Sequence, residues 1–234
     1  MAETSGASGN RTRNRSLSRT AFHRDRRFLL PRSGRDAVLL LAALALLVVS
    51  ALPIDPHHVG GLETSVFHSV NDLPAGLYWP VWVVMQLGNL LAVPALAIGA
   101  LLWRRVRLAV DLVLAGAGAW LAAKVVKQIV PRGRPGELLG HVVLRHAPAA
   151  GNGFVAGHAA TAFALATVAW PYLGRRARWA GVALAAIVAF GRVYVGAHLP
   201  LDVVGGAALG VAVGSIVHVL LGAPSTSDPE EQPA

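Results

Sequence analysis

Side chains suited to binding an anionic group occur in three short segments of the sequence. The first segment, KQIVPRGRP, begins with Lys127 and ends with Arg134 and Pro135. A guanidinium offers a planar fork of donors that matches phosphate oxygens, and an ammonium adds a compact charge beside it. We therefore expect Lys127 and Arg134 to bind phosphate. The alternative for basic residues that end an apolar helix is snorkelling to the membrane interface.

The second segment, GNGFVAGHAA, is a glycine-rich loop that leads into an apolar stretch. Gly157 and His158 stand where a helix is expected to begin. Glycines let the backbone approach an anion closely, and the free N–H groups of a helix start favour negative charge. His158 has a side chain that titrates near neutrality, so it is suited to protonating a leaving oxygen. The alternative is a histidine that only begins a helix.

The third segment, GRVYVGAHLPLD, contains Arg192, His198 and Asp202. Pro200 suits the first position of a helix, which puts Asp202 in the first turn, near His198. A carboxylate there accepts the proton of one imidazole nitrogen and leaves the other free to attack phosphorus. This is the orienting logic of a catalytic triad with histidine as the nucleophile.

The elements that carry these segments are expected to be membrane helices. Of the 234 residues 54% are hydrophobic and only 14% are charged, and the mean hydropathy is +0.53. A membrane helix needs roughly 20 mostly apolar residues, and six such stretches follow one another along the chain. We predict an all-α polytopic protein with six transmembrane helices, at about Ala37 to Pro53, Tyr78 to Trp103, Leu108 to Val130, His158 to Leu173, Trp179 to Val195 and Leu201 to Leu221.

The distribution of basic residues predicts the orientation in a membrane. Nine of the 21 Lys and Arg residues lie in the first 35 positions, whereas the loop from Asp55 to Leu77 has none. Because Lys and Arg are enriched in cytoplasmic loops, both termini are expected in the cytoplasm and the three segments outside it. The protein is expected at the cell membrane, and we interpret its sequence as the product of a GC-rich bacterial gene. The arginines of the two further cytoplasmic turns are Arg104, Arg105, Arg107, Arg175, Arg176 and Arg178.

The ends of the chain are expected to be solvated tails around one membrane domain. Residues 1–36 are basic and polar, residues 37–222 form the membrane domain, and residues 223–234 are short, acidic and contain proline. A block of like charge seldom folds, and near a membrane it favours anionic lipid headgroups. We therefore interpret the net charge of +9 as contact with membrane lipids and predict no nucleic-acid partner.

Several other features are predicted to be structural. Trp79 and Trp82 are typical of an interfacial belt, and glycines four residues apart on the last span predict close helix packing. Asp111 follows Arg107 by four residues, which predicts an ion pair. Neither a metal site nor a disulfide is expected, because the loop histidines lack ligand spacing and the chain has no cysteine. The glycines are Gly206, Gly210 and Gly214, the histidines are His57, His58 and His68, and His141, Arg145 and His146 are expected in a solvated loop.

Taken together and in this order, the three segments resemble the signature motifs of the type 2 phosphatidic acid phosphatase family, KxxxxxxRP, PSGH and SRxxxxxHxxxD. The resemblance spans roughly residues 36–221 and implies a metal-independent enzyme without a cofactor. The matching residues are Lys127, Arg134, Pro135, Gly157, His158, Arg192, His198 and Asp202.

The resemblance also implies a role for each matching side chain. His198 would attack phosphorus and form a phosphohistidine, and Asp202 would orient it. His158 would protonate the leaving lipid oxygen and then assist hydrolysis of the intermediate. In phosphoryl transfer the protein mostly supplies positioning and positive charge. The residues that would hold the phosphate are Lys127, Arg134 and Arg192.

The sequence departs from the family pattern at two places. Val155 and Ala156 replace the Pro-Ser of the second motif, and Gly191 replaces the Ser of the third. A hydroxyl donor is thereby lost, which would cost on the order of 2 to 4 kcal/mol of transition-state stabilisation if that donor acts like one in an oxyanion hole. The main-chain N–H groups of Ala156 and Gly157 are expected to remain available to phosphate.

Three functions follow from these observations. The first is a phosphatase acting on a lipid phosphate or diphosphate, such as a polyprenyl diphosphate, phosphatidic acid or phosphatidylglycerol phosphate. The second is a phosphotransferase that passes the phosphoryl group from His198 to another acceptor. The third is a non-catalytic protein that binds or moves anionic lipids, which would have no need for the spacing of His198 and Asp202.

Overall fold

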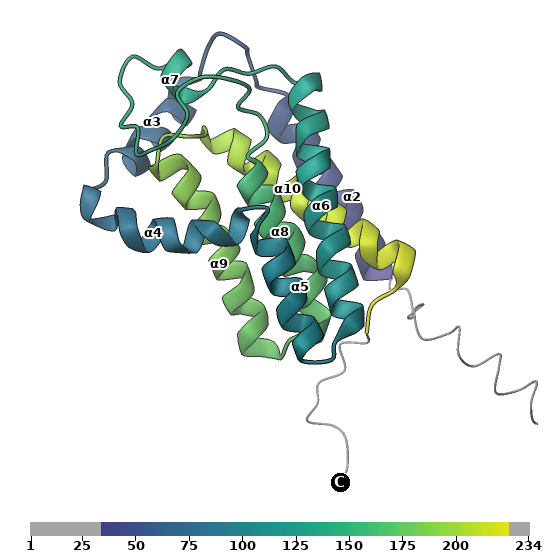
Figure 1. Cartoon of the computed structure of the whole chain (residues 1–234). Coiled ribbons are helices and arrows are strands. Elements are labelled where there is room, and N and C mark those ends of the chain that lie inside the picture. The colour runs from purple at the N-terminus through teal and green to yellow at the C-terminus, as the bar shows by residue number, and fades with distance from the viewer. Residues whose placement is uncertain (1–33, 225–234) are drawn as a thin grey trace, which may run out of the picture.

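The computed structural model describes residues 34–224, and these residues form helices and loops without a β-strand (Figure 1). The expected basic and acidic tails therefore lie almost wholly outside the described residues. Several helices are broken or flanked by short 3-10 turns. In chain order the elements are α2 (Gly34–Ala51), α3 (Gly61–Asn71), η2 (Ala75–Leu77), α4 (Tyr78–Met85), η3 (Gln86–Gly88), α5 (Ala92–Leu102), α6 (Val106–Ile129), α7 (Pro135–Leu138), α8 (Gly157–Ala169), η4 (Trp170–Tyr172), α9 (Arg175–Tyr194) and α10 (Pro200–Leu221).

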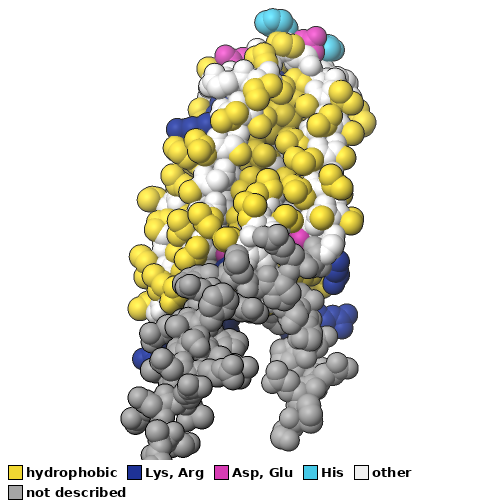
Figure 2. Space-filling model, turned by 90° about the vertical axis from the view of Figure 1, so that its right-hand side faces the viewer, with side chains coloured by type: hydrophobic (Ala, Val, Ile, Leu, Met, Phe, Trp, Pro, Cys, Tyr) yellow, Lys and Arg dark blue, Asp and Glu magenta, His cyan; other side chains and the backbone are white. Residues whose placement is uncertain are grey.

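Four helices are long and apolar enough to cross a membrane, namely α2, α6, α9 and α10. The helices α4 and α5 pass the same test only as a pair, so the described part of the chain offers four or five candidate spans. The remaining predicted span corresponds to α8, which has 13 residues and continues into the turn η4. The all-α class is confirmed, and the count of six spans stays a prediction. Apolar side chains cover most of the described surface that is visible in Figure 2.

The stretch expected to be one helix from Tyr78 to Trp103 is broken. Its two halves meet at an angle of 71°, and α4 crosses the bundle while α5 runs along it (Figure 1). At the break, the side-chain oxygen of Asn89 accepts the N–H of Leu91 at 3.2 Å, a local turn that competes with the helix. Gly88 lies against His158, since a Cβ at Gly88 would be 2.6 Å from the His158 carbonyl oxygen. The bend therefore abuts the start of α8.

The helix α8 lies inside the bundle, in contact with α6, α9 and α10. Its approach to α10 is as close as backbones allow. A Cβ at Gly210 would be 2.3 Å from the Ala160 carbonyl oxygen, and a Cβ at Gly206 would be 2.5 Å from that of Ala156. Small residues permit such contact between membrane helices. The predicted packing role of the glycines of α10 is confirmed.

The loop between α7 and α8 is fastened to the end of α9 by two polar side chains, the buried Asn71 and the half-buried Arg145. The Asn71 side chain donates to the carbonyls of Val143 and Tyr194, at 3.0 Å each, and accepts the N–H of Val143 at 2.8 Å. The Arg145 guanidinium donates to the carbonyls of Asn71, Leu73 and Tyr194 at 2.7–2.8 Å. Arg145 was expected to be solvated, but it anchors this loop instead.

The opposite end of the bundle carries the predicted ion pair. Arg107 Nε lies 2.9 Å from Asp111 Oδ1, and the Tyr172 hydroxyl donates to the other oxygen of Asp111 at 2.7 Å. Arg107 also donates to the carbonyls of Leu221 and Gly222, at the end of α10. The ion pair is confirmed, and it links three segments at this end of the bundle.

Candidate active site

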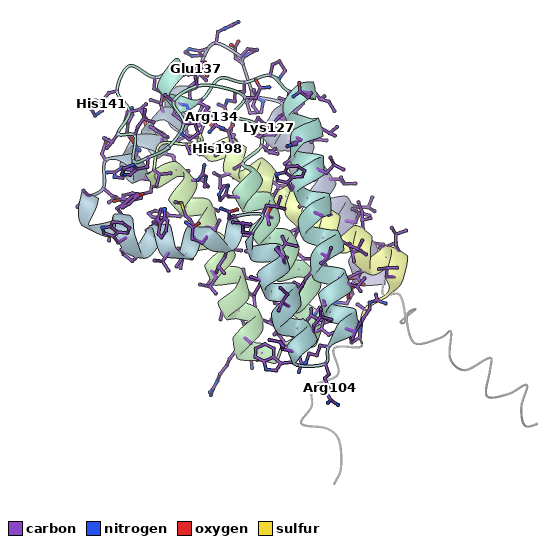
Figure 3. The ribbon with its side chains drawn as sticks, viewed as in Figure 1. Arg104, Lys127, Arg134, Glu137, His141 and His198 are labelled. Carbon is purple, nitrogen blue, oxygen red and sulfur yellow. The ribbon has the colours of Figure 1, made fainter. Side chains whose placement is uncertain are left out.

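The three segments meet at one end of the bundle. Figure 3 shows Lys127, Arg134 and His198 close together at this end, whereas Arg104 lies at the other end. The side chains come from the end of α6, the starts of α7 and α8, the end of α9 and the turn that leads into α10. We refer to this end as the site end and to the other as the arginine end. The grouping of the three segments that their residue types suggested is therefore present in the fold.

Lys127 joins the first segment to the second. It stands in the last turn of α6, and its Nζ donates to the carbonyls of Asn152 and Gly153 at 2.9 and 3.0 Å. The Asn152 side chain donates back to the Lys127 carbonyl at 3.1 Å. The ammonium is thereby held over the glycine-rich loop, which limits the positions it can take.

Arg134 joins the first segment to the third. Its Nη1 donates to the carbonyl of Ala197 at 2.9 Å, and its Nε is buried without a hydrogen-bond partner in residues 34–224. Burial lowers the pKa of Arg134 from its ordinary value, although an arginine remains charged at neutral pH. The Glu137 carboxylate accepts the N–H groups of Arg134 and Gly151, at 3.0 and 3.1 Å, and fixes the turn.

The glycine-rich loop is tied down by its main chain. The N–H of Gly153 donates to the Arg132 carbonyl at 2.7 Å, and the N–H of Ala156 donates to the main-chain carbonyl of Asp202 at 2.8 Å. The Ala156 N–H was expected to be available to phosphate, but it is already engaged in this structure. The Ala156 side chain is fully buried in an apolar cluster with Ala159 and Ala189.

The start of α8 carries the other two residues expected in this segment. Gly157 is the first helical residue and His158 the second, directly after Ala156 at the N-cap. In an α-helix the first N–H groups have no partner within the helix, so the amides of Gly157 and His158 suit an anion. The site end therefore retains donors at the start of α8 even though Ala156 is not one of them.

His198 and Asp202 lie together, as their spacing suggested. His198 Nδ1 is 3.6 Å from Asp202 Oδ2, just beyond hydrogen-bond distance, and both side chains are almost fully buried. The N–H of Leu199 also donates to Asp202 Oδ2, at 2.9 Å, at the start of α10. Burial lowers the pKa of His198 to about 4, and the nearby charges of Arg192 and Lys127 lower it further while Asp202 opposes them. The imidazole is therefore neutral at pH 7, as a nucleophile must be.

Arg192 stands in the last turn of α9 with its guanidinium at the same site. Its Nε is buried, and within the described residues it has no hydrogen-bond partner. The main-chain carbonyl of Arg192 accepts the N–H groups of Ala197 and His198, at 3.0 and 3.2 Å. The turn that presents His198, which passes through Gly196 at a φ of 77°, is thus built on Arg192.

The Gly191 departure has a packing reason. A Cβ at Gly191 would lie 2.6 and 2.7 Å from Met85 Cγ and Sδ, and 2.8 Å from Val81 Cγ1. The helix α4 therefore occupies the space that a serine side chain would take. The loss of this serine accompanies the close approach of α4 to α9.

Two residues at the site end were not singled out from the sequence. Arg132 has a side chain that is only 1% exposed, and it forms ion pairs with Glu63 of α3 and with Asp202. Burial alone would lower the pKa of Arg132, but the two carboxylates outweigh it and the pKa is raised. The only signal for Arg132 in the sequence was its positive charge in a loop that was expected outside the cytoplasm. The sequence contained no signal for Glu63.

Within residues 34–224 no three His, Asp or Glu side chains are grouped so that they could hold a metal ion. His68 pairs with Asp72 at 3.5 Å and stacks on His141. The polar residues of the site itself are dominated by cations, which suits an anion.

Comparison with known proteins agrees with this geometry. The PAP2 superfamily matches residues 106–224, slightly more than half of the chain, from the start of α6 to beyond the end of α10. The chain belongs to the PAP2 superfamily. The matched region contains all three segments, whereas α2 to α5 lie outside it.

Two solved structures resemble this PAP2 chain. The crystal structure of Aquifex aeolicus LpxE is 26% identical, with a TM-score of 0.63, and the match covers 68% of this chain and 95% of that one. A transmembrane PAP2-type phosphatidylglycerolphosphate phosphatase from Bacillus subtilis is 20% identical, with a TM-score of 0.57 over 78% and 93% of the two chains, and shares the fold. No curated protein matches. With its apolar helices, this PAP2 chain is a membrane protein.

Proposed function

We propose that this PAP2 chain is a membrane phosphatase that hydrolyses a lipid phosphate through a phosphohistidine at His198. The observation that carries the proposal is the pair of His198 and Asp202 among the three cations of the site. Asp202 Oδ2 faces Nδ1 of the imidazole at 3.6 Å, which favours the tautomer with a lone pair on Nε2. Family membership and the two structural relatives support phosphatase chemistry.

The proposed reaction has two steps. His198 Nε2 attacks phosphorus, the bond from phosphorus to the lipid oxygen breaks, and His158 gives that oxygen its proton. Water then attacks the phosphohistidine with His158 as base, which releases inorganic phosphate and restores Nε2. The three cations stabilise charge on the phosphoryl oxygens, which is the main contribution of a protein to phosphoryl transfer. These cations are Lys127, Arg134 and Arg192.

The reaction is tested with purified protein in detergent and a panel of lipid phosphates in the presence of EDTA. The panel contains phosphatidic acid, phosphatidylglycerol phosphate and a polyprenyl diphosphate. Wild-type protein should release phosphate, and His198→Ala should lose this activity while His58→Ala, in an exposed loop, keeps it. Equal activity of wild type and His198→Ala would refute the mechanism. Transfer of label to an added alcohol, with little free phosphate, would indicate a phosphotransferase.

We also propose that the site end faces away from the cytoplasm. The arginine end carries Arg104 and the arginine-rich start of α9, in keeping with the enrichment of basic residues in cytoplasmic loops (Figure 3). Because the chain has no cysteine, a single cysteine at His141 provides a clean label. A membrane-impermeant maleimide should react with this cysteine in intact cells. Reaction only after lysis would indicate that the site end faces the cytoplasm.

A further inference from the structure

A buried arginine at the site end is held between two carboxylates. Arg132 Nη1 donates to Asp202 Oδ1 at 2.9 Å and to Glu63 Oε1 at 3.1 Å, and its Nη2 donates to Glu63 Oε2. The exposed fractions of the three side chains are 1% for Arg132, 0% for Asp202 and 9% for Glu63. Removal of one partner from such a buried set leaves an uncompensated charge, which is strongly unfavourable.

Glu63 is fixed by a second contact of its own. Its Oε1 accepts the N–H of Leu201, in the first turn of α10, at 2.9 Å. The helix α3 is therefore bonded both to Arg132 and to the helix that carries Asp202. Through these bonds Glu63, which precedes Leu201 by 138 positions, is held at the site.

The contacts of Asp202 leave one direction for its carboxylate. Arg132 occupies Oδ1, while Oδ2 accepts the N–H of Leu199 and faces Nδ1 of His198. A carboxylate with donors on both oxygens cannot rotate about its terminal bond without breaking hydrogen bonds. Hydrogen bonds to charged groups are among the stronger ones in proteins.

We propose that Arg132, held by Glu63, is a positioning residue that fixes the carboxylate of Asp202 against His198. This inference rests on the proposed function, because it assigns Arg132 to the histidine that would attack phosphorus. Arg132 acts through Asp202 and not on the phosphate. Both of its terminal nitrogens are bonded to carboxylates. Among the contacts described for residues 34–224, the guanidinium groups of Arg134 and Arg192 have no carboxylate bond, whereas a buried Nε without a partner is common to all three arginines.

The charge arrangement supports this division of roles. The positive charge of Arg132 is offset by Glu63, so a bound phosphate does not draw the guanidinium away from Asp202. Among residues 34–224, no carboxylate forms an ion pair with the three cations expected to bind phosphate, which lie in the same site. Removing Glu63's charge would free Arg132 to attract phosphate and weaken its hold on Asp202.

The inference is tested with Arg132→Lys, Arg132→Gln, Glu63→Gln and the double variant Glu63→Gln/Arg132→Gln. Each is assayed in detergent with dioctanoyl phosphatidic acid and the rest of the lipid panel, and its melting temperature is measured. We expect kcat to fall on the order of 100-fold in Arg132→Gln and roughly 10-fold in Arg132→Lys, since lysine keeps the charge but loses the fork of donors. KM should change little, because Arg132 does not touch the phosphate.

The double variant separates positioning from simple charge neutralisation. If Arg132 holds Asp202, the double variant stays as slow as Arg132→Gln, whereas recovery of wild-type kcat would overturn the inference. A rise in KM at unchanged kcat would make Arg132 a phosphate ligand and also overturn it. A fall in melting temperature with unchanged kcat per folded molecule in Arg132→Lys and Glu63→Gln would reduce the network to a structural role.

A matched control and the wild type complete the design. Arg178→Gln removes an arginine at the arginine end whose guanidinium donates to the Trp170 carbonyl and lies over the Trp170 ring, and it should leave kcat unchanged. Wild-type protein that releases no phosphate from any lipid of the panel would refute the proposed function, and the inference with it. Wild-type turnover together with full kcat in Arg132→Gln would refute the inference alone.

Discussion

The contact between α8 and α10 at Gly210 predicts that alanine there disturbs both stability and catalysis. An added Cβ would lie 2.3 Å from the Ala160 carbonyl oxygen, whereas ordinary contact begins at 3.4 Å. The obstructing atom belongs to the backbone, so no side chain can rotate away. The two helices must move apart by about 1 Å, and His158 moves with α8 relative to the residues of α10.

The size of the effect follows from this displacement. Overpacking of this kind costs about 1–3 kcal/mol of the free energy of unfolding. A misplacement of about 1 Å between reacting groups lowers a rate on the order of 100-fold. Gly181→Ala is the matched control, because nothing lies within 4 Å of its added Cβ. Gly181→Ala in α9 should raise the free energy of unfolding by up to about 1 kcal/mol, because alanine has a higher helix propensity than glycine.

The assay combines thermal unfolding in detergent with turnover of a lipid phosphate. Gly210→Ala should have a lower melting temperature and a lower kcat than wild type, and Gly181→Ala should match or exceed wild type in stability at full kcat. If Gly210→Ala is as stable and as active as Gly181→Ala, then α8 and α10 are not in backbone contact, and the argument from their distance fails.

Three further predictions concern the pH dependence, the α4 contact and the loop anchor. Because burial lowers the pKa of His198 to about 4, protonation of this side chain should reduce kcat/KM only near pH 4. A loss on the acid side that is centred at pH 6.5 would contradict this. Gly191→Ser should lower the free energy of unfolding by about 1–3 kcal/mol through overpacking against Met85. In a double-mutant cycle of melting temperatures, Met85→Ala should offset part of that loss. Purely additive effects would argue against the contact. Asn71→Ala should leave both main-chain groups of Val143 without their partner. The free energy of unfolding should fall by about 1–3 kcal/mol for each group, and proteolysis of the loop should become faster. An unchanged cleavage rate would show that Asn71 does not anchor the loop.

The gathering of these residues at one end of the bundle was predictable because their types are rare in apolar sequence. Lysine, arginine and histidine stand out against membrane helices, and their order along the chain matches a family pattern. The glycine contacts of α10 and the pair of Arg107 and Asp111 were predictable from helical spacing alone, since residues three and four apart share a face.

The parts that were not predictable depend on contacts between distant segments. Glu63 is one acidic residue on a short helix, and only the fold brings it to Arg132. The break after Gly88 follows from local turns and from packing against His158, which hydropathy does not register. The amide of Ala156 was expected to be free, because nothing in the sequence indicates that its partner is the Asp202 carbonyl, 46 positions later.

The anchoring of the loop between α7 and α8 has a consequence for how such proteins diversify. Its two anchors, Asn71 and Arg145, bond to main-chain groups, and every polypeptide offers the same carbonyls and amides whatever its side chains. Most positions of the loop are therefore interchangeable without loss of attachment. The part of the loop around Val143 can therefore change most of its side chains while Asn71, Arg145 and the helices beneath it remain as they are.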